Sequence, residues 1–117
     1  MIIEVDEGQH RSYKSCGNTR EERMATENRR MFGIFQSLFH GIPVIFIRYN
    51  PDTFRDENNI LQKIPETKRQ AIFLSWVKRC IRNEDGCEGC VAKYLFYNGW
   101  KESDVLYSQI TDEMVLN

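Results

Sequence analysis

The sequence has no long hydrophobic run, and no stretch approaches the ~18–20 consecutive apolar residues that cross a bilayer. The N-terminal segment is acidic, and its apolar run is too short for a secretory signal peptide. These absences predict a protein without membrane segments that works inside the cell, in the cytoplasm or the nucleus. We therefore expect its four cysteines to be mostly reduced.

The chain also lacks a strong surplus of charge. Its formal net charge is −1 and its pI is about 6.1, so the composition contains no global signature of nucleic-acid binding. Basic residues are nevertheless concentrated in segments 11–30 and 68–82, and local basic faces hold phosphates even when net charge is near zero. The alternative is that these residues form solvated helix faces with ordinary ion pairs.

Motifs for zinc are scarce. Cys87 and Cys90 have the spacing of a metal knuckle, with Cys80 before them, but there is no second pair of this kind. A structural zinc normally needs four ligands. The remaining candidates for a fourth ligand are Cys16, His10 and His40. We therefore expect ordinary buried or loop thiols at Cys80, Cys87 and Cys90, and no structural zinc.

Hydrophobic periodicity in the 117 residues predicts one α/β domain. Strands are expected near 2–6, 43–48 and 91–97, and helices near 19–39 and 66–82. The run 44–47 is continuously apolar, which is typical of a strand covered on both faces. A helix between two apolar strands favours a parallel pair. Segment 51–62 is expected to be a polar loop, and the last ten residues to be weakly structured.

Both predicted helices have an apolar stripe at helical spacing, which we expect to face the core. In the first helix the stripe consists of Met24, Met31, Ile34, Phe35 and Leu38. In the second helix it consists of Ile72, Phe73, Trp76, Val77, Cys80 and Ile81.

The first predicted strand has two carboxylates on one face. Glu4 and Asp6 alternate with Ile3 and Val5, so the acidic and apolar side chains point in opposite directions. Neighbouring carboxylates repel each other, and a hard divalent cation is a usual reason to keep such a pair. His10 follows the strand, where it could bind metal, contact phosphate or carry a proton. The alternative is a solvated face on an edge strand.

The order of these motifs resembles a known group of nucleases. The motif Glu4-x-Asp6-x-x-x-His10 and Tyr13 are followed by an arginine-rich helix start and by the run PVIFIRYNP at 43–51. Over about residues 2–52 this pattern is similar to the restriction-endonuclease-like superfamily with a divergent PD-(D/E)xK site, and most to its Vsr-like members. Sequences of this kind are associated with large DNA viruses.

The resemblance implies a partial three-layer restriction-endonuclease-like core, with a mixed sheet flanked by helices. It implies a single nuclease-like domain over 1–117 that hydrolyses phosphodiester bonds in DNA with Mg²⁺ or Mn²⁺. Glu4 and Asp6 would hold the metal, and His10 would join them as the catalytic group.

The sequence departs from the family pattern in two ways. The family's N-terminal helix and first acidic strand have no counterpart before Met1, and Asp6 stands where the common motif has a lysine. Full activity would then require a missing N-terminal segment or a second copy in a homodimer. The other interpretation is a non-catalytic nucleic-acid-binding or assembly domain that retains the nuclease fold.

Three arginines are candidates for binding DNA phosphates. Arg20 and Arg23 lie at the predicted helix start, where the helix dipole and the guanidinium fork favour anions. Arg48 ends a buried strand, and functional groups gather at the carboxyl ends of strands in open α/β sheets. The alternatives are a surface or ion-pair role for Arg23 and a structural ion pair between Arg48 and the segment 6–7.

Overall fold

The computed structural model describes residues 1–6, 20–38 and 42–111, and the side chains of 20–24 and 38 also lie outside the described part. The elements are β1 (Ile2–Val5), α1 (Arg20–Leu38), β2 (Val44–Tyr49), β3 (Phe54–Arg55), β4 (Leu61–Gln62), α2 (Glu66–Ile81), β5 (Cys90–Leu95) and β6 (Ser108–Ile110). Both predicted helices and all three predicted strands are confirmed, so the chain is a mixed α/β domain. Neither helix, within the residues described, is long and apolar enough to cross a membrane.

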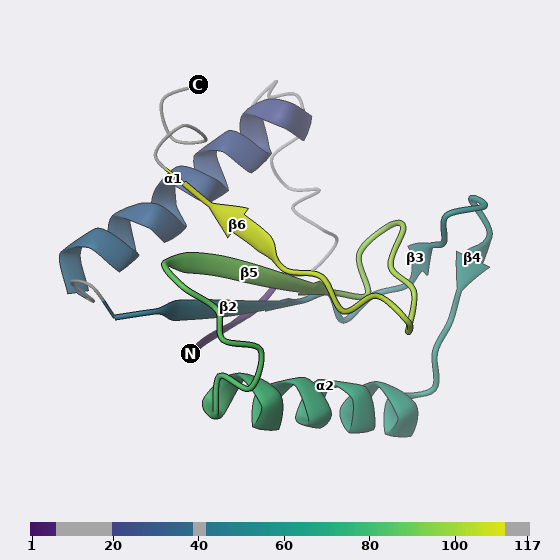
Figure 1. Ribbon diagram of the computed structural model, residues 1–117. Helices are drawn as coiled ribbons and strands as arrows, with labels where there is room; N and C mark the ends of the chain where they lie inside the picture. The colour runs from purple at the N-terminus through teal and green to yellow at the C-terminus, as the bar shows by residue number, and fades with distance from the viewer. Residues whose placement is uncertain (7–19, 39–41, 112–117) are drawn as a thin grey trace.

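Four strands form one mixed sheet in the order β1-β2-β5-β6 (Figure 1). β1, β2 and β5 are parallel, and β6 is antiparallel to β5. The predicted parallel pairing is therefore confirmed. β2 lies between two strands and its residues 44–48 are all buried, which explains its continuous apolar run. β1 lies at one edge of the sheet.

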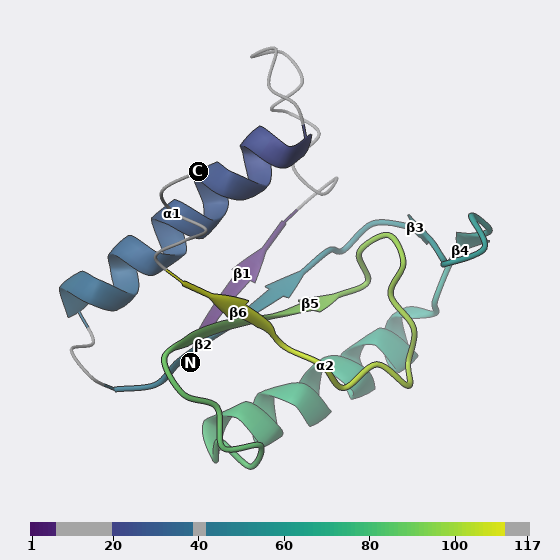
Figure 2. The same ribbon diagram turned by 45° about the horizontal axis from the view of Figure 1, so that its top comes forward.

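The two helices cover opposite faces of this sheet, which makes three layers (Figures 1 and 2). On the α1 side the buried residues are Met31, Phe32, Val44, Phe46, Cys90, Ala92 and Ile110. On the α2 side they are Ile45, Ile47, Phe54, Trp76, Cys80, Val91, Leu95 and Phe96. Strand residues alternate between the two clusters, as the pleat requires. Cys80 and Cys90 therefore lie in cores on opposite faces of the sheet. The sheet separates the two thiols, so they do not face one shared metal ion.

Two expectations about short segments and one about a single residue are wrong. Segment 51–62 contains an antiparallel pair, β3 and β4, in which Phe54 is buried and in register with Gln62. Within the last ten residues, β6 pairs with β5, and Ile110 is buried opposite Cys90. Ile81 of the second stripe is exposed, because it is the last residue of α2. Strands of two or three residues are too short to show a period in sequence.

β5 ends at Leu95, before the predicted end at 97, because Phe96 has a φ of +66°. This conformation is rare for a bulky residue and persists only where the surroundings fix it. The Phe96 side chain is fully buried, and its carbonyl accepts a hydrogen bond from the Asn50 side-chain amide at 2.8 Å. The resulting turn directs Tyr97 towards Asp6, which follows the end of β1.

Candidate functional site

Charged side chains gather at the carboxyl ends of β1 and β2. Glu4 is in register with Arg48 on the neighbouring strand. Asp6 follows β1 directly, and its backbone N–H donates to the carbonyl of Tyr49 at 2.7 Å. Because the two strands are parallel, their carboxyl ends meet at the same end of the sheet.

Two arginines bind three carboxylates at this position. Arg48 is 2% exposed and donates to Asp6 and Glu27, each at 3.1 Å. Arg30 of α1 contacts both carboxylate oxygens of Glu4 at 2.8 Å. Arg30 also donates to Glu27 at 2.7 Å, so Glu27 bridges the two arginines. We call these five residues the carboxylate–arginine cluster.

The surroundings keep both guanidinium groups charged. The hydrogen bond to Glu4 raises the pKa of Arg30, although partial burial opposes this effect. Burial alone would lower the pKa of Arg48, but the negative charges of nearby carboxylates, Asp6 and Glu27, outweigh it and raise that pKa. The cluster therefore places two permanent positive charges against its carboxylates.

Two tyrosines contact the cluster on the side of β5. The hydroxyl of Tyr97 donates to the carboxylate of Asp6. The Tyr94 ring lies 5.9 Å from the Arg48 guanidinium and contacts the Tyr97 ring edge-on at 5.1 Å. Burial raises the pKa of Tyr97, and the hydrogen bond to Asp6 raises it further. The phenol therefore stays protonated and acts as a donor to Asp6.

The structure brings together half of the site residues that the sequence singled out. Glu4, Asp6 and Arg48 all belong to the cluster. Arg48 forms the ion pair with Asp6 that was the alternative to phosphate binding. Outside the described part of the chain lie His10 and the side chains of Arg20 and Arg23. The roles of these three residues stay predictions.

Sequence reasoning missed Glu27, Arg30 and Tyr97. Glu27 lies four residues before Met31, on the apolar stripe of the helix, which is a signal that its carboxylate is buried. A buried carboxylate needs a partner, so this position indicates a charged site. Tyr97 has no such signal, because its place depends on the unusual backbone of Phe96.

The cluster offers three carboxylates as oxygen ligands, and each of them already contacts an arginine. Within residues 1–6, 20–38 and 42–111, no three His, Cys, Asp or Glu side chains are placed to hold one metal ion. Carboxylate oxygens suit Mg²⁺ or Mn²⁺. Such an ion would compete with Arg30, whose side chain is 40% exposed, for the carboxylate of Glu4. A divalent ion could therefore bind the Glu4 carboxylate only by displacing the Arg30 guanidinium.

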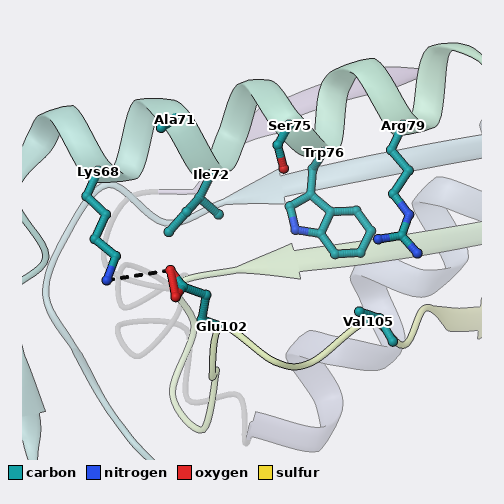
Figure 3. A pocket seen from close by; sticks show the side chains of 8 residues that line it. All are labelled: Lys68, Ala71, Ile72, Ser75, Trp76, Arg79, Glu102 and Val105. Atoms are coloured by element: carbon teal, nitrogen blue, oxygen red, sulfur yellow. Dashed lines mark ion pairs between the residues drawn. The ribbon is translucent and has the colours of Figure 1, made fainter.

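A separate groove of about 420 Å³ lies between α2 and the segment 102–105 (Figure 3). Its apolar lining includes Ile72, Trp76 and Val105. Lys68 and Glu102 form an ion pair across it at 3.5 Å, and both side chains are largely exposed. Exposed pairs of this kind contribute little energy. The groove is on the α2 side of the sheet, so it does not belong to the carboxylate–arginine cluster.

Comparison of the chain with protein-family models, with curated proteins and with solved structures gave no match. The fold and the site define an α/β domain with a charged cluster at the carboxyl ends of two parallel strands. Because one fold supports many functions, the function has to be argued from the cluster itself.

Proposed function

We propose that this chain is a restriction-endonuclease-like domain that hydrolyses phosphodiester bonds in DNA with Mg²⁺ or Mn²⁺. The observation that carries the proposal is that Glu4 of β1 and Asp6, which follows β1, converge beside Arg48 at the ends of parallel strands. Carboxylates bind the ion in such sites, and guanidinium forks bind phosphate oxygens. The strand–helix–strand order around the cluster agrees with the resemblance over residues 2–52.

The contacts support a role for each member of the site. Glu4 and Asp6 would hold the ion, which when bound polarises the phosphate and lowers the pKa of water. Arg48 and Tyr97 hold Asp6 in one orientation through its Oδ2 atom. Arg30 would turn from Glu4 to a DNA phosphate when the ion binds, since its guanidinium is partly exposed.

Residues outside the described part complete the proposal. His10 would contact the phosphate or protonate the leaving oxygen. Arg20 and Arg23 would bind backbone phosphates near the start of α1. Two carboxylates leave most of the coordination shell to water, so the affinity for the ion should be weak.

The metal site is tested by calorimetric titration with Mn²⁺. We expect Glu4→Gln to lower the affinity at least about tenfold, the smallest loss typical even of outer-shell partners. Arg30→Gln should raise the affinity about two- to fivefold, because it removes a competing exposed cation worth up to about 1 kcal/mol. Glu102→Gln, on the opposite face of the sheet, is the matched control and should bind like wild type.

Circular dichroism establishes that the variants are folded before they are titrated. Equal affinity in wild type and Glu4→Gln would remove Glu4 from the metal site. An unchanged affinity in Arg30→Gln would show that Arg30 does not compete with the ion for Glu4.

Cleavage is tested with supercoiled plasmid DNA in Mg²⁺ or Mn²⁺. We expect slow nicking by the wild-type chain, because two carboxylates fix the ion poorly. Glu4→Gln should abolish the metal-dependent product, and Glu102→Gln should leave it unchanged. Nicking that persists in Glu4→Gln would place the chemistry on other residues.

The second candidate is a non-catalytic nucleic-acid-binding or assembly domain that retains this fold. The observation that favours it is the burial of Arg48 against Asp6, because buried ion pairs often have a structural role. Plasmid binding that weakens steeply with salt, without nicking in either metal, would favour this candidate.

A further inference from the structure

The outer edge of β1 presents a row of backbone donors and acceptors. No strand among the described residues pairs with this edge. The N–H of Asp6 points to β2, where it donates to Tyr49. Backbone groups of alternate residues in a strand point the same way, so those of Glu4 also face β2. The backbone groups of Ile3 and Val5 therefore face outwards.

The same two residues have uncovered apolar side chains. Ile3 is in register with Ile47 and Val5 with Tyr49, so they extend the apolar face on the α2 side. The cover from α2 reaches Tyr49, whose ring meets Phe73 at 5.4 Å. The neighbouring strand β1 has less cover, since Ile3 is 44% exposed and Val5 is 66% exposed. The strand order places β1 on the far side of β2 from β5 and β6, and Figure 2 shows β1 beside β2.

Edge strands of soluble proteins are usually protected by lysine, proline or a bulge. β1 has no lysine or proline. Its one charged residue, Glu4, points to the α1 side, where Arg30 holds it. This edge therefore has the features of a strand that accepts another strand.

We propose that β1 pairs antiparallel with β1 of a second copy of this chain, which joins the two sheets into one. The strand is complementary to itself about a two-fold axis at Ile3. Such an axis places Ile3 against Ile3 of the other copy, and Val5 against Met1, which is 43% exposed. The exposed apolar side chains of the two copies then cover one another.

Charge selects this register over its neighbour. Only every second residue faces outwards, so the pairing can shift only in steps of two residues. The neighbouring register sets Glu4 opposite Glu4 of the other copy, which places like charges together. The register centred on Ile3 sets Glu4 opposite Ile2 and keeps the two acidic side chains apart.

The pairing needs neither metal nor DNA, so it is independent of the proposed function. In the joined sheet both carboxylate–arginine clusters lie on the same face, because antiparallel neighbours in one sheet share their faces. A contact made by one short strand is smaller than a standard interface of about 1,600 Å². The dimer should therefore dissociate on dilution.

The test is sedimentation equilibrium of the full chain at rising concentration. The wild-type mass should rise from 13.9 kDa towards twice this value. Val5→Lys should remain at 13.9 kDa, because it places a charge at the contact without disturbing the monomer core. Val5→Pro, which removes one outward N–H, should also weaken the dimer. Leu106→Lys changes a residue that is 77% exposed near the other edge of the sheet, and should dimerise like wild type.

Circular dichroism and hydrogen exchange complete the test. Variants are compared only if their circular dichroism spectra match that of wild type. In hydrogen exchange, the amides of Ile3 and Val5 should become protected as the wild-type concentration rises. A wild-type mass of 13.9 kDa into the millimolar range would overturn the proposal. Dimerisation of Val5→Lys like wild type, or loss of the dimer in Leu106→Lys, would also overturn it by placing the contact elsewhere.

Discussion

Replacing Arg48 with methionine is expected to lower the free energy of unfolding by about 3–5 kcal/mol. The guanidinium of Arg48 is shared between Asp6 and Glu27, and all three residues are buried. Methionine keeps much of the apolar volume but removes the charge, so two buried carboxylates lose their common partner. An uncompensated buried charge costs several kcal/mol, whereas a broken exposed pair typically costs no more than about 1 kcal/mol.

Urea unfolding followed by the fluorescence of Trp76 and Trp100 measures this loss. Arg82→Met is the matched control, because Arg82 is 77% exposed and lies only loosely near Glu84 at 3.9 Å. Its effect should remain within about 0.5 kcal/mol. A loss below about 1 kcal/mol in Arg48→Met would show that the carboxylates reach water or other partners without unfolding.

A double-mutant cycle separates the lost charge from the lost packing. Glu27→Gln added to Arg48→Met removes one of the carboxylates that the arginine had neutralised. The double variant should therefore be less destabilised than the sum of the single variants, by about 0.5–3 kcal/mol. Additive effects would show that Arg48 and Glu27 are not coupled, and would assign the loss in Arg48→Met to Asp6 or to packing against Tyr94.

The long elements of the fold could be predicted because each shows its period several times. Met31 lies at 0% exposure on the predicted stripe of α1, and residues 44–47 are buried as the continuous apolar run indicates. The face shared by Glu4 and Asp6 also followed from strand alternation. It is confirmed by their common partner Arg48 and by the exposure of Ile3 on the other face.

The cluster itself could be predicted only in part, because its partners come from distant segments. The position of Arg48 at a strand end indicates a functional location, but it does not distinguish a phosphate ligand from an ion pair. That distinction depends on Glu27, which is brought near by the packing of α1 across the sheet. The place of Tyr97 depends on the positive φ of Phe96, and residue type gives no signal for such a conformation in an aromatic residue.

Arg69 of α2 is a second buried arginine, and it supports the turn after β5. Its guanidinium donates to the carbonyls of Asn50 at 2.9 Å, Asp52 at 2.7 Å and Ile64 at 3.2 Å. It also lies over the Phe96 ring, 4.7 Å from the centroid. The side chain therefore connects the segments that follow β2 and β5, where the cluster is built.

Arg69→Met is expected to lower the free energy of unfolding by about 3 kcal/mol. In this variant three carbonyls lose a charged donor, and a buried carbonyl without a partner costs about 1–3 kcal/mol. The same urea titration measures it. Lys68→Met is the control on the adjacent residue, which is 57% exposed, and should change stability by less than about 0.5 kcal/mol.

The variants of the two buried arginines should also differ in local amide exchange, and not only in stability. Arg48→Met changes the charges around Asp6, whereas Arg69→Met leaves those charges in place and loosens the turn that carries Tyr97. Amide exchange at Phe96 and Tyr97 should therefore accelerate more in Arg69→Met than in Arg48→Met. A stability of Arg69→Met equal to that of Lys68→Met would show that water satisfies the three carbonyls. Phe96 would then keep its left-handed conformation without the guanidinium.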